Sequence, residues 1–191
     1  MLIYLQIIAG IWIVFMAFLF IPAIWASTPV ERVSIQYVKG SIILAIIVVA
    51  IVVLLSSYGS KTLMFRIIPD SQLAGITGIL LTFIGFGFST WARLHLGKNW
   101  SSMVEVKVGH RLVRTGPYRM VRNPMYTGFI ISFVGAAVAF GQVLGFVVLG
   151  IMIISIWGKI KAEETILLEK FGEEYRQYKK DVRAAIIPWI V

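Results

Sequence analysis

The chain has no cysteine and few residues that commonly bind metals. Its 191 residues include no Cys, 2 His and 9 Asp or Glu. Without cysteine there can be no disulfide, no thiol nucleophile and no thiolate ligand. The histidines, His95 and His110, have no Asp or Glu at ligand spacing, so we predict no metal site.

Polar residues are also scarce. Hydrophobic residues make up 59% of the chain, and the mean hydropathy is +0.87. Soluble domains contain nearer ~45–50% apolar residues, so the composition excludes an ordinary soluble protein. The net charge is +9. Beside long apolar runs, this excess favours anionic lipid as a partner and argues against nucleic acid. The length indicates one structural domain.

The apolar residues fall in five runs. The first three are near the ~20 residues that span a bilayer as a helix. The last two are shorter and are separated by Gly141-Gln142, which predicts a tight helical hairpin. At ~1.5 Å per residue each arm covers only ~24 Å, so tilt, a thinner bilayer or an incomplete crossing all stay open. The first run is longer than the ~7–15 apolar residues of a signal peptide, so we expect it to be retained. The five runs are 2–24, 41–59, 73–92, 125–140 and 143–157.

The basic residues predict an orientation. All Lys and Arg except Lys61 and Arg66 lie in 27–40, in 93–124 or in the tail from Gly158. With five spans these segments share one side, which the positive-inside rule places in the cytoplasm. We therefore expect the N-terminus outside, three spans over residues 1–92, and a catalytic region over residues 93–191.

The glycines of the third run and a segment of alternating polarity predict local features. Gly75, Gly78, Gly85 and Gly87 fall in the third run without a nucleotide-binding spacing, so we expect them to serve helix packing. Residues 104–108 alternate in polarity and predict a short strand or an extended lid.

The segment 109–128 concentrates the polar chemistry. Asn123 suits an N-cap and Pro124 the first helical position, so a helix should begin here. Arg119 and Arg122 precede that helix start. Together they can form an anion site, or the arginines can reach lipid headgroups; the motif alone fits both. Tyr126 in the first turn is typical of either an interfacial anchor or a ligand contact.

A pair of adjacent carboxylates, Glu163-Glu164, follows the fifth run. They can belong to a solvated helix leaving the membrane, or they can bind ribose hydroxyls or a cation. Gly172 predicts a helix end. Tyr175 and Tyr178 then follow at helical spacing, on a face that we expect to pack over the site. We expect Lys179, Lys180 and Arg183 to meet lipid headgroups.

Taken together, these motifs resemble a known family. Gly-Pro-Tyr at 116–118, Arg-Asn-Pro-Met-Tyr-Thr-Gly at 122–128, a hydrophobic hairpin, Glu-Glu and Phe-Gly-Glu-Glu-Tyr at 171–175 are similar to the isoprenylcysteine carboxyl methyltransferases. The wider group includes phospholipid N-methyltransferases and membrane thiol methyltransferases. The resemblance covers about residues 94–182.

The resemblance implies an all-α integral membrane fold and an S-adenosylmethionine site that faces the cytoplasm. The loop 93–124 and the C-terminal helix would close this site, and S-adenosylhomocysteine would be the product. The implied catalytic residues are Arg122 and Glu163, and Lys159 would contact the substrate. The implied cofactor residues are His110, Arg111, Leu112, Val113, Tyr118, Asn123, Pro124, Met125, Tyr126, Glu163 and Glu164.

The resemblance also bears on the methyl acceptor, which we expect to be a lipophilic molecule or a lipid-anchored group. Prenylcysteine enzymes of the family usually have His where Asn123 stands and Arg where Lys159 stands. Asn cannot act as a base, and Lys loses bidentate recognition of a carboxylate. The nearest activity is carboxyl O-methylation of isoprenylcysteine; phospholipid N-methylation and thiol S-methylation are alternatives.

Two other classes stay open at this stage. A membrane reductase has a similar C-terminal region but binds NADPH, and usually needs more spans. A non-enzymatic membrane protein would use the same spans and basic loops, but gives no reason for Arg-Asn-Pro and Glu-Glu to occur together.

Overall fold

The computed structural model describes residues 2–25, 62–97 and 112–187. Within these ranges the chain is helical, and its only extended pairing is an isolated bridge between Arg66 and Gln142. The predicted second span, 41–59, and the predicted strand or lid, 104–108, lie outside the described residues. The elements are α1 (Leu2–Trp25), α3 (Gln72–Leu96), the 3-10 turn η2 (Gly116–Arg119), α4 (Pro124–Phe140), α5 (Val143–Phe171) and α6 (Glu173–Asp181).

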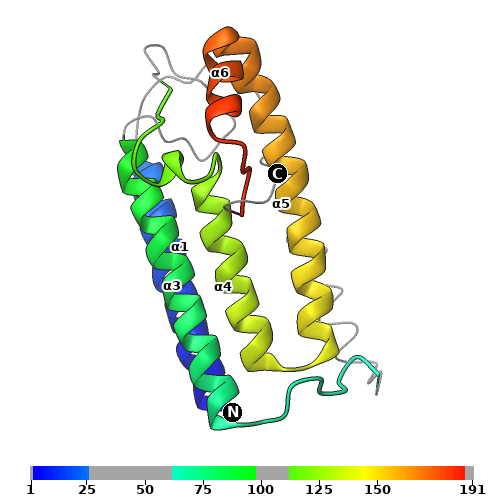
Figure 1. The fold of residues 1–191 in the computed structure, drawn as a ribbon. Helices are drawn as coiled ribbons and strands as arrows, with labels where there is room; N and C mark the ends of the chain where they lie inside the picture. Colours follow the sequence, from blue (N-terminus) through cyan, green and yellow to red (C-terminus); the bar gives the residue numbers. More distant parts are fainter. Residues whose placement is uncertain (1, 26–61, 98–111, 188–191) are drawn as a thin grey trace.

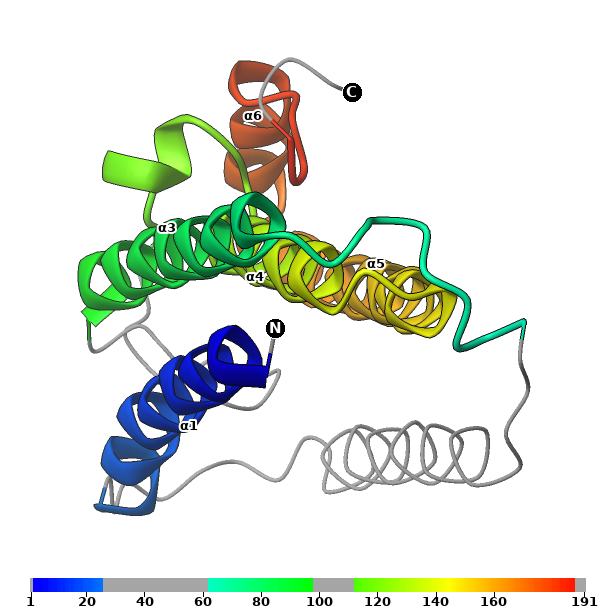
Figure 2. The same ribbon diagram turned by 90° about the horizontal axis from the view of Figure 1, so that it is seen from below.

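The long helices form a layer with one helix against its face. In Figure 1, α3, α4 and α5 stand side by side, with α6 and η2 gathered at one end. Figure 2 shows α1 on one face of this row. The helices α3 and α5 are long and apolar enough to cross a membrane, which indicates a membrane protein.

Small residues let α3 and α4 approach closely. Gly78 lies against Gly135 and Ala139, and Gly85 lies against Gly128 and Ser132. Side-chain hydroxyls then bond across the interface: Ser132 Oγ donates to Thr82 O at 3.1 Å, and Ser89 Oγ donates to Met125 O at 2.9 Å. Small and hydroxyl residues are the usual means of helix association in lipid. The predicted packing role of the glycines is confirmed at Gly75, Gly78 and Gly85, whereas Gly87 has no neighbour within 4 Å.

Aromatic rings fix α1 to the row. Phe15 stacks on Phe86 with ring centroids 4.1 Å apart, and Trp12 meets Phe86 edge-on at 4.6 Å. Phe129 of α4 joins the same cluster, 5.4 Å from Phe15. Such pairs add about 0.5–1.5 kcal/mol each beyond simple burial.

The connection between α4 and α5 is short and is held by a third segment. Gly141 takes a left-handed conformation (φ 69°), which glycine adopts without strain. The carbonyl oxygen of Gly141 accepts bonds from the N–H groups of Ile67 and Ile68, at 2.8 and 3.1 Å. The N–H of Val143 donates to Phe65 O at 3.0 Å. Residues 62–68 therefore clamp the turn.

The helix α5 is longer than the apolar run that it contains. The predicted apolar arm ends at Trp157, and α5 continues without a break through Glu163-Glu164 to Phe171, next to the helix end predicted at Gly172. At ~1.5 Å per residue, a helix of 29 residues is ~43 Å long. The continuation contains Lys, Ala, Glu and Leu, which are strong helix formers, and only Gly158 opposes them. The carboxylate pair therefore lies on the same continuous helix as the apolar arm.

Candidate functional site

The site is built at the end of the row where α4 begins and α6 lies. Asn123 precedes the helix and Pro124 is its first residue, as predicted. The expected capping bond is absent, however, because Asn123 Nδ2 donates instead to Ala185 O at 3.1 Å. The side chain thus joins the helix start to the C-terminal end of the described chain.

Residues 182–187, which we call the C-terminal strap, lie along the start of α4. The N–H of Arg122 donates to Ala184 O and the N–H of Asn123 donates to Ala185 O, both at 3.0 Å. One turn into α4, the buried hydroxyl of Thr127 donates to Ile186 O. Consecutive carbonyl groups of the strap are therefore each bound by the α4 start.

Arg122 and Glu164 form a buried ion pair beside this strap. Arg122 Nε lies 2.8 Å from Glu164 Oε1, and the two side chains are 9% and 7% exposed. Arg122 Nη1 also donates to Val182 O at 2.8 Å and to Arg183 O. Burying an isolated charge is costly, and these partners offset that cost.

Lys179 of α6 completes the group. Its Nζ lies 2.8 Å from Glu164 Oε2, so both carboxylate oxygens of Glu164 are paired with cations. We expected Lys179 at lipid headgroups, and that prediction is wrong. The turn at Gly172 places α6 so that the lysine neutralises a buried carboxylate instead. Gly172 ends α5 as predicted, with φ 51°.

Glu163, next to Glu164 on α5, faces a different partner. Neighbouring helical residues are about 100° apart, so the two carboxylates diverge. Glu163 Oε1 accepts a hydrogen bond of 2.5 Å from the hydroxyl of Tyr126 on α4. Lys159, one turn before Glu163, places its ammonium 5.6 Å from the centroid of the Tyr126 ring. A carboxylate, a phenol and an ammonium are thus brought together between α4 and α5.

Tyr118 lies at the same end, on η2. Its ring stacks on that of His95, with centroids 6.5 Å apart, and His95 Nε2 lies 2.8 Å from Thr115 Oγ1. The hydroxyl of Tyr178 donates to Tyr118 O at 2.7 Å. Burial raises the pKa of the Tyr118 hydroxyl above its ordinary value, so this tyrosine is neutral at physiological pH.

The helix α6 covers the loop before η2. Tyr175 and Tyr178 are buried with Val182, and Leu112 packs against this cluster. Arg114 reinforces the contact through an ion pair of 3.0 Å with Glu174. The tyrosine face of α6, which we expected to pack over the site, packs against Leu112 of this loop.

The other predicted cofactor residues are distributed as follows. Pro124 is buried, while Val113 and Met125 are half-buried. Two more, His110 and Arg111, lie outside the described residues. Among the residues that the structure does describe, no group of three or more His, Cys, Asp or Glu side chains is placed to hold a metal ion.

Sequence reasoning missed the strap, its partner Thr127, and Lys179 as the partner of Glu164. Thr127 and Lys179 both bind at the site, yet neither belongs to the predicted set. Thr127 stands one turn after Asn123 inside the motif, which is the one signal that could have found it. The carbonyl groups of the strap carry no side-chain signature.

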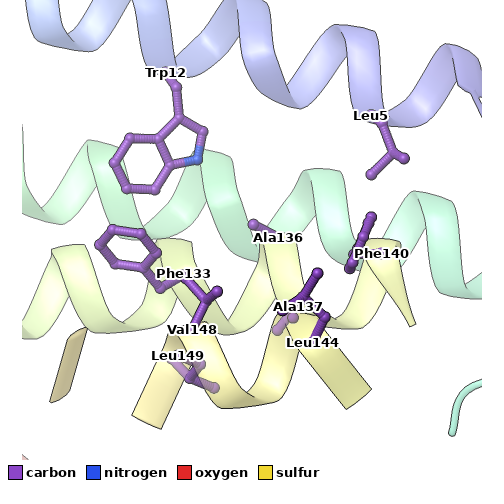
Figure 3. Close-up of a pocket in the computed structure, with 10 residues that line it drawn as sticks. Leu5, Trp12, Phe133, Ala136, Ala137, Phe140, Leu144, Val148 and Leu149 are labelled. Carbon is purple, nitrogen blue, oxygen red and sulfur yellow. The ribbon is translucent and has the colours of Figure 1, made fainter. Parts of the chain in front are cut away.

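A separate groove of about 290 Å³ lies between α1, α4 and α5. Figure 3 shows Trp12 and Phe133 facing each other across it. Its lining is apolar and has no titratable side chain, so it cannot supply acid, base or charge to a reaction. The lining residues are Leu5, Trp12, Phe133, Ala136, Ala137, Phe140, Leu144, Gly145, Val148 and Leu149.

The part of the chain that contains these residues matches a known protein family. The family model described as phospholipid methyltransferase matches residues 73–174, which include the predicted site from Tyr118 to Glu164. A probable protein-S-isoprenylcysteine O-methyltransferase of Oryza sativa subsp. indica is 26% identical over 130 residues, covering 66% of this chain and 68% of that protein.

Two further relatives match smaller parts of their own length. The protein-S-isoprenylcysteine O-methyltransferase of Saccharomyces cerevisiae is 33% identical over 122 residues, covering 61% of this chain and 50% of that protein. Methanethiol S-methyltransferase 1 of Bradyrhizobium diazoefficiens is 43% identical over 72 residues, covering 38% of this chain and 24% of that protein.

Proposed function

The chain belongs to the phospholipid methyltransferase family, and from this premise we propose that it is a membrane enzyme that moves a methyl group from S-adenosylmethionine to a lipophilic acceptor. S-adenosylhomocysteine is the second product. The observation that carries the proposal is the convergence of Tyr126, Glu163 and Lys159 between α4 and α5. It is a polar group at the end of helices that are otherwise apolar.

The chemistry of this group fits S-adenosylmethionine. The cofactor offers ribose hydroxyls, which donate to a carboxylate. Glu163 has one hydrogen bond from Tyr126, whereas a carboxylate can accept about four. Lys159 has three donors and points a positive charge toward the same space. Of the cofactor residues given by the family resemblance, Tyr126 contacts Glu163 directly, and Glu164 on the same helix holds Arg122 and Lys179.

The protein's own residues would position the two reactants for a displacement reaction. When bound, the cofactor supplies an electrophilic methyl group. Holding the acceptor in line with that methyl group, and keeping water away from both, are the tasks left to the protein. Tyr126 and Glu163 fix one another through their hydrogen bond, and the apolar cluster of Ile156, Ile160 and Ile186 packs against Tyr126.

A carboxylate acceptor suits the site best. A carboxylate is already ionised at pH 7, so its methylation needs no general base. Lys159 can attract it as a point charge. Relatives that are named protein-S-isoprenylcysteine O-methyltransferases support this order of preference. A thiol acceptor is second, since one relative is named a methanethiol S-methyltransferase, and a phospholipid amine is third.

The orientation follows from the basic residues. We propose that the end of the row carrying α6 faces the cytoplasm and that the N-terminus lies outside. The water-soluble cofactor would then enter from the cytoplasm, and the acceptor would enter sideways from the membrane.

The test is methyl transfer in vesicles. Purified protein is supplied with methyl-labelled S-adenosylmethionine and, separately, with a farnesylated cysteine, a hydrophobic thiol or phosphatidylethanolamine. We expect label in one acceptor, and a loss of ~100-fold in Glu163→Gln, as for other single groups that stabilise a transition state. Glu169→Gln is the matched control, because Glu169 is exposed on the same helix. Equal rates in the two variants would refute the assignment of Glu163.

A further inference from the structure

The C-terminal strap fills the space between α4 and α5 beside the proposed site. Figure 1 shows it running from α6 into that space. Ile186 is buried with Ile156 and Ile160 of α5, and Ala185 and Tyr126 pack against this cluster. The strap therefore presents an apolar wall directly beside the Tyr126–Glu163 pair.

Polar groups at the start of α4 bind the strap. Its successive carbonyl groups, from Val182 to Ile186, are bound by Arg122, Asn123 and Thr127. All three residues lie at the start of α4, within or next to the Arg-Asn-Pro motif. A backbone segment bound in this way is placed by the motif as well as by its own buried side chains.

Arg122 binds both the strap and Glu164. Its Nε bonds to Glu164, its Nη1 bonds to Val182 O and Arg183 O, and only 9% of its side chain is exposed. A guanidinium engaged in this way is poorly placed to meet an incoming anion. Glu164 in turn is held by Lys179 of α6, the helix from which the strap leads.

We propose that Arg122 is a positioning residue that acts through the strap. With Glu164 it fastens the strap across the space between α4 and α5, where Ile186 is buried and the half-buried Ala185 forms the surface along which the apolar part of the acceptor lies. This inference rests on the proposed function, because it needs an acceptor whose reacting group lies near Glu163 and Lys159. The acceptor's hydrophobic part must then lie on the adjoining apolar wall.

The position of the strap can be measured without activity. The chain has no cysteine, so Ala184→Cys introduces a unique thiol at a site that is 6% exposed. We expect slow maleimide labelling in this background and a labelling rate about tenfold higher when Arg122→Gln is added, as for the loss of one charge-assisted hydrogen bond. Arg119→Gln is the control, because Arg119 is exposed on η2 and does not touch the strap. Thr127→Val loosens the strap without changing Arg122 and should also raise the rate.

Kinetics then separate positioning from direct catalysis. In Arg122→Gln and Thr127→Val we expect the KM for the acceptor to rise about tenfold, while the affinity for S-adenosylhomocysteine stays within about threefold. Arg122→Lys should recover part of the loss.

Abolished transfer at saturating acceptor, with labelling of Ala184→Cys unchanged, would overturn the inference, because Arg122 would then act directly on the reactants. Unchanged labelling and KM in both variants would also overturn it. Failure of the wild-type protein to bind S-adenosylhomocysteine would refute the proposed function alone, because the labelling result tests the strap independently.

Discussion

The contact between α3 and α4 yields a sharp stability prediction at Gly85. A methyl group added here would lie 2.6 Å from the backbone nitrogen of Ser132 and closer still to the carbonyl oxygen of Gly128. Ordinary van der Waals contacts begin at 3.4 Å. In Gly85→Ala the two helices must therefore separate by about 1 Å, because backbone atoms cannot rotate away as a side chain can.

The magnitude follows from two losses. Overpacking a close contact costs about 1–3 kcal/mol. Separation also weakens the interhelical hydrogen bond from Ser132 Oγ to Thr82 O, 3.1 Å long, which contributes about 1 kcal/mol. Alanine favours a helix over glycine by about 1 kcal/mol, so we expect Gly85→Ala to lower the free energy of unfolding by a net of about 1–3 kcal/mol.

Gly87 on the same helix is the matched control. A methyl group there meets nothing within 4 Å. Alanine favours a helix over glycine by about 1 kcal/mol, so Gly87→Ala should be neutral or stabilising. Thermal unfolding in detergent, followed by circular dichroism, should show a fall in Tm of roughly 2–12 °C for Gly85→Ala and no fall for Gly87→Ala. Equal Tm values would refute the close packing of α3 and α4.

Three further predictions concern the polar end of the bundle. Glu164→Ala removes the shared partner of two cations and should lower the free energy of unfolding by about 3 kcal/mol. Denaturant titration measures this loss, with the exposed-site variant Glu169→Ala as the control. An equal loss in both variants would contradict the buried ion pair. Burial raises the pKa of Tyr175 and Tyr178, so above pH ~10 the unfolded chain loses protons that the folded chain keeps. Each of these tyrosines should then reduce stability by ~1.4 kcal/mol per pH unit, and Tyr178→Phe should flatten the alkaline branch of a Tm-against-pH curve. Gly116→Ala places a methyl group 2.7 Å from the ring of His95 at φ 59°, and should cost at least about 1 kcal/mol in the same titration; a neutral result would contradict the packing of η2 on α3.

Much of the architecture could be predicted from the sequence because it is local. Helix length follows from the length of an apolar run, so the first, third and fourth runs appear as α1, α3 and α4 close to their predicted bounds. The start of α4 at Pro124 and the end of α5 at Gly172 follow from residues with restricted backbone preferences. The apolar run ends earlier, at Trp157, because hydropathy reports membrane depth, whereas a helix continues through charged residues that favour it.

The site was only partly predictable, because it depends on contacts between distant segments. Glu163 and Tyr126 were both singled out, but their hydrogen bond joins residues 37 positions apart. Glu164 was predicted to bind the cofactor and Arg122 to be catalytic, and the structure pairs the two with each other. A carboxylate motif on one helix does not reveal which of its two members faces a neighbouring helix. The strap was missed because it is bound through backbone carbonyl groups, which every sequence has.

Calorimetric binding of S-adenosylhomocysteine to purified protein in detergent tests the central claim most directly, with NADPH as a second ligand and Glu163→Gln as the variant. The proposed site predicts micromolar binding of S-adenosylhomocysteine, no binding of NADPH, and a loss of at least about 10-fold in affinity in the variant, because a carboxylate that accepts hydrogen bonds from the ligand is replaced. Binding of NADPH alone, or equal binding of S-adenosylhomocysteine by Glu163→Gln, would contradict it.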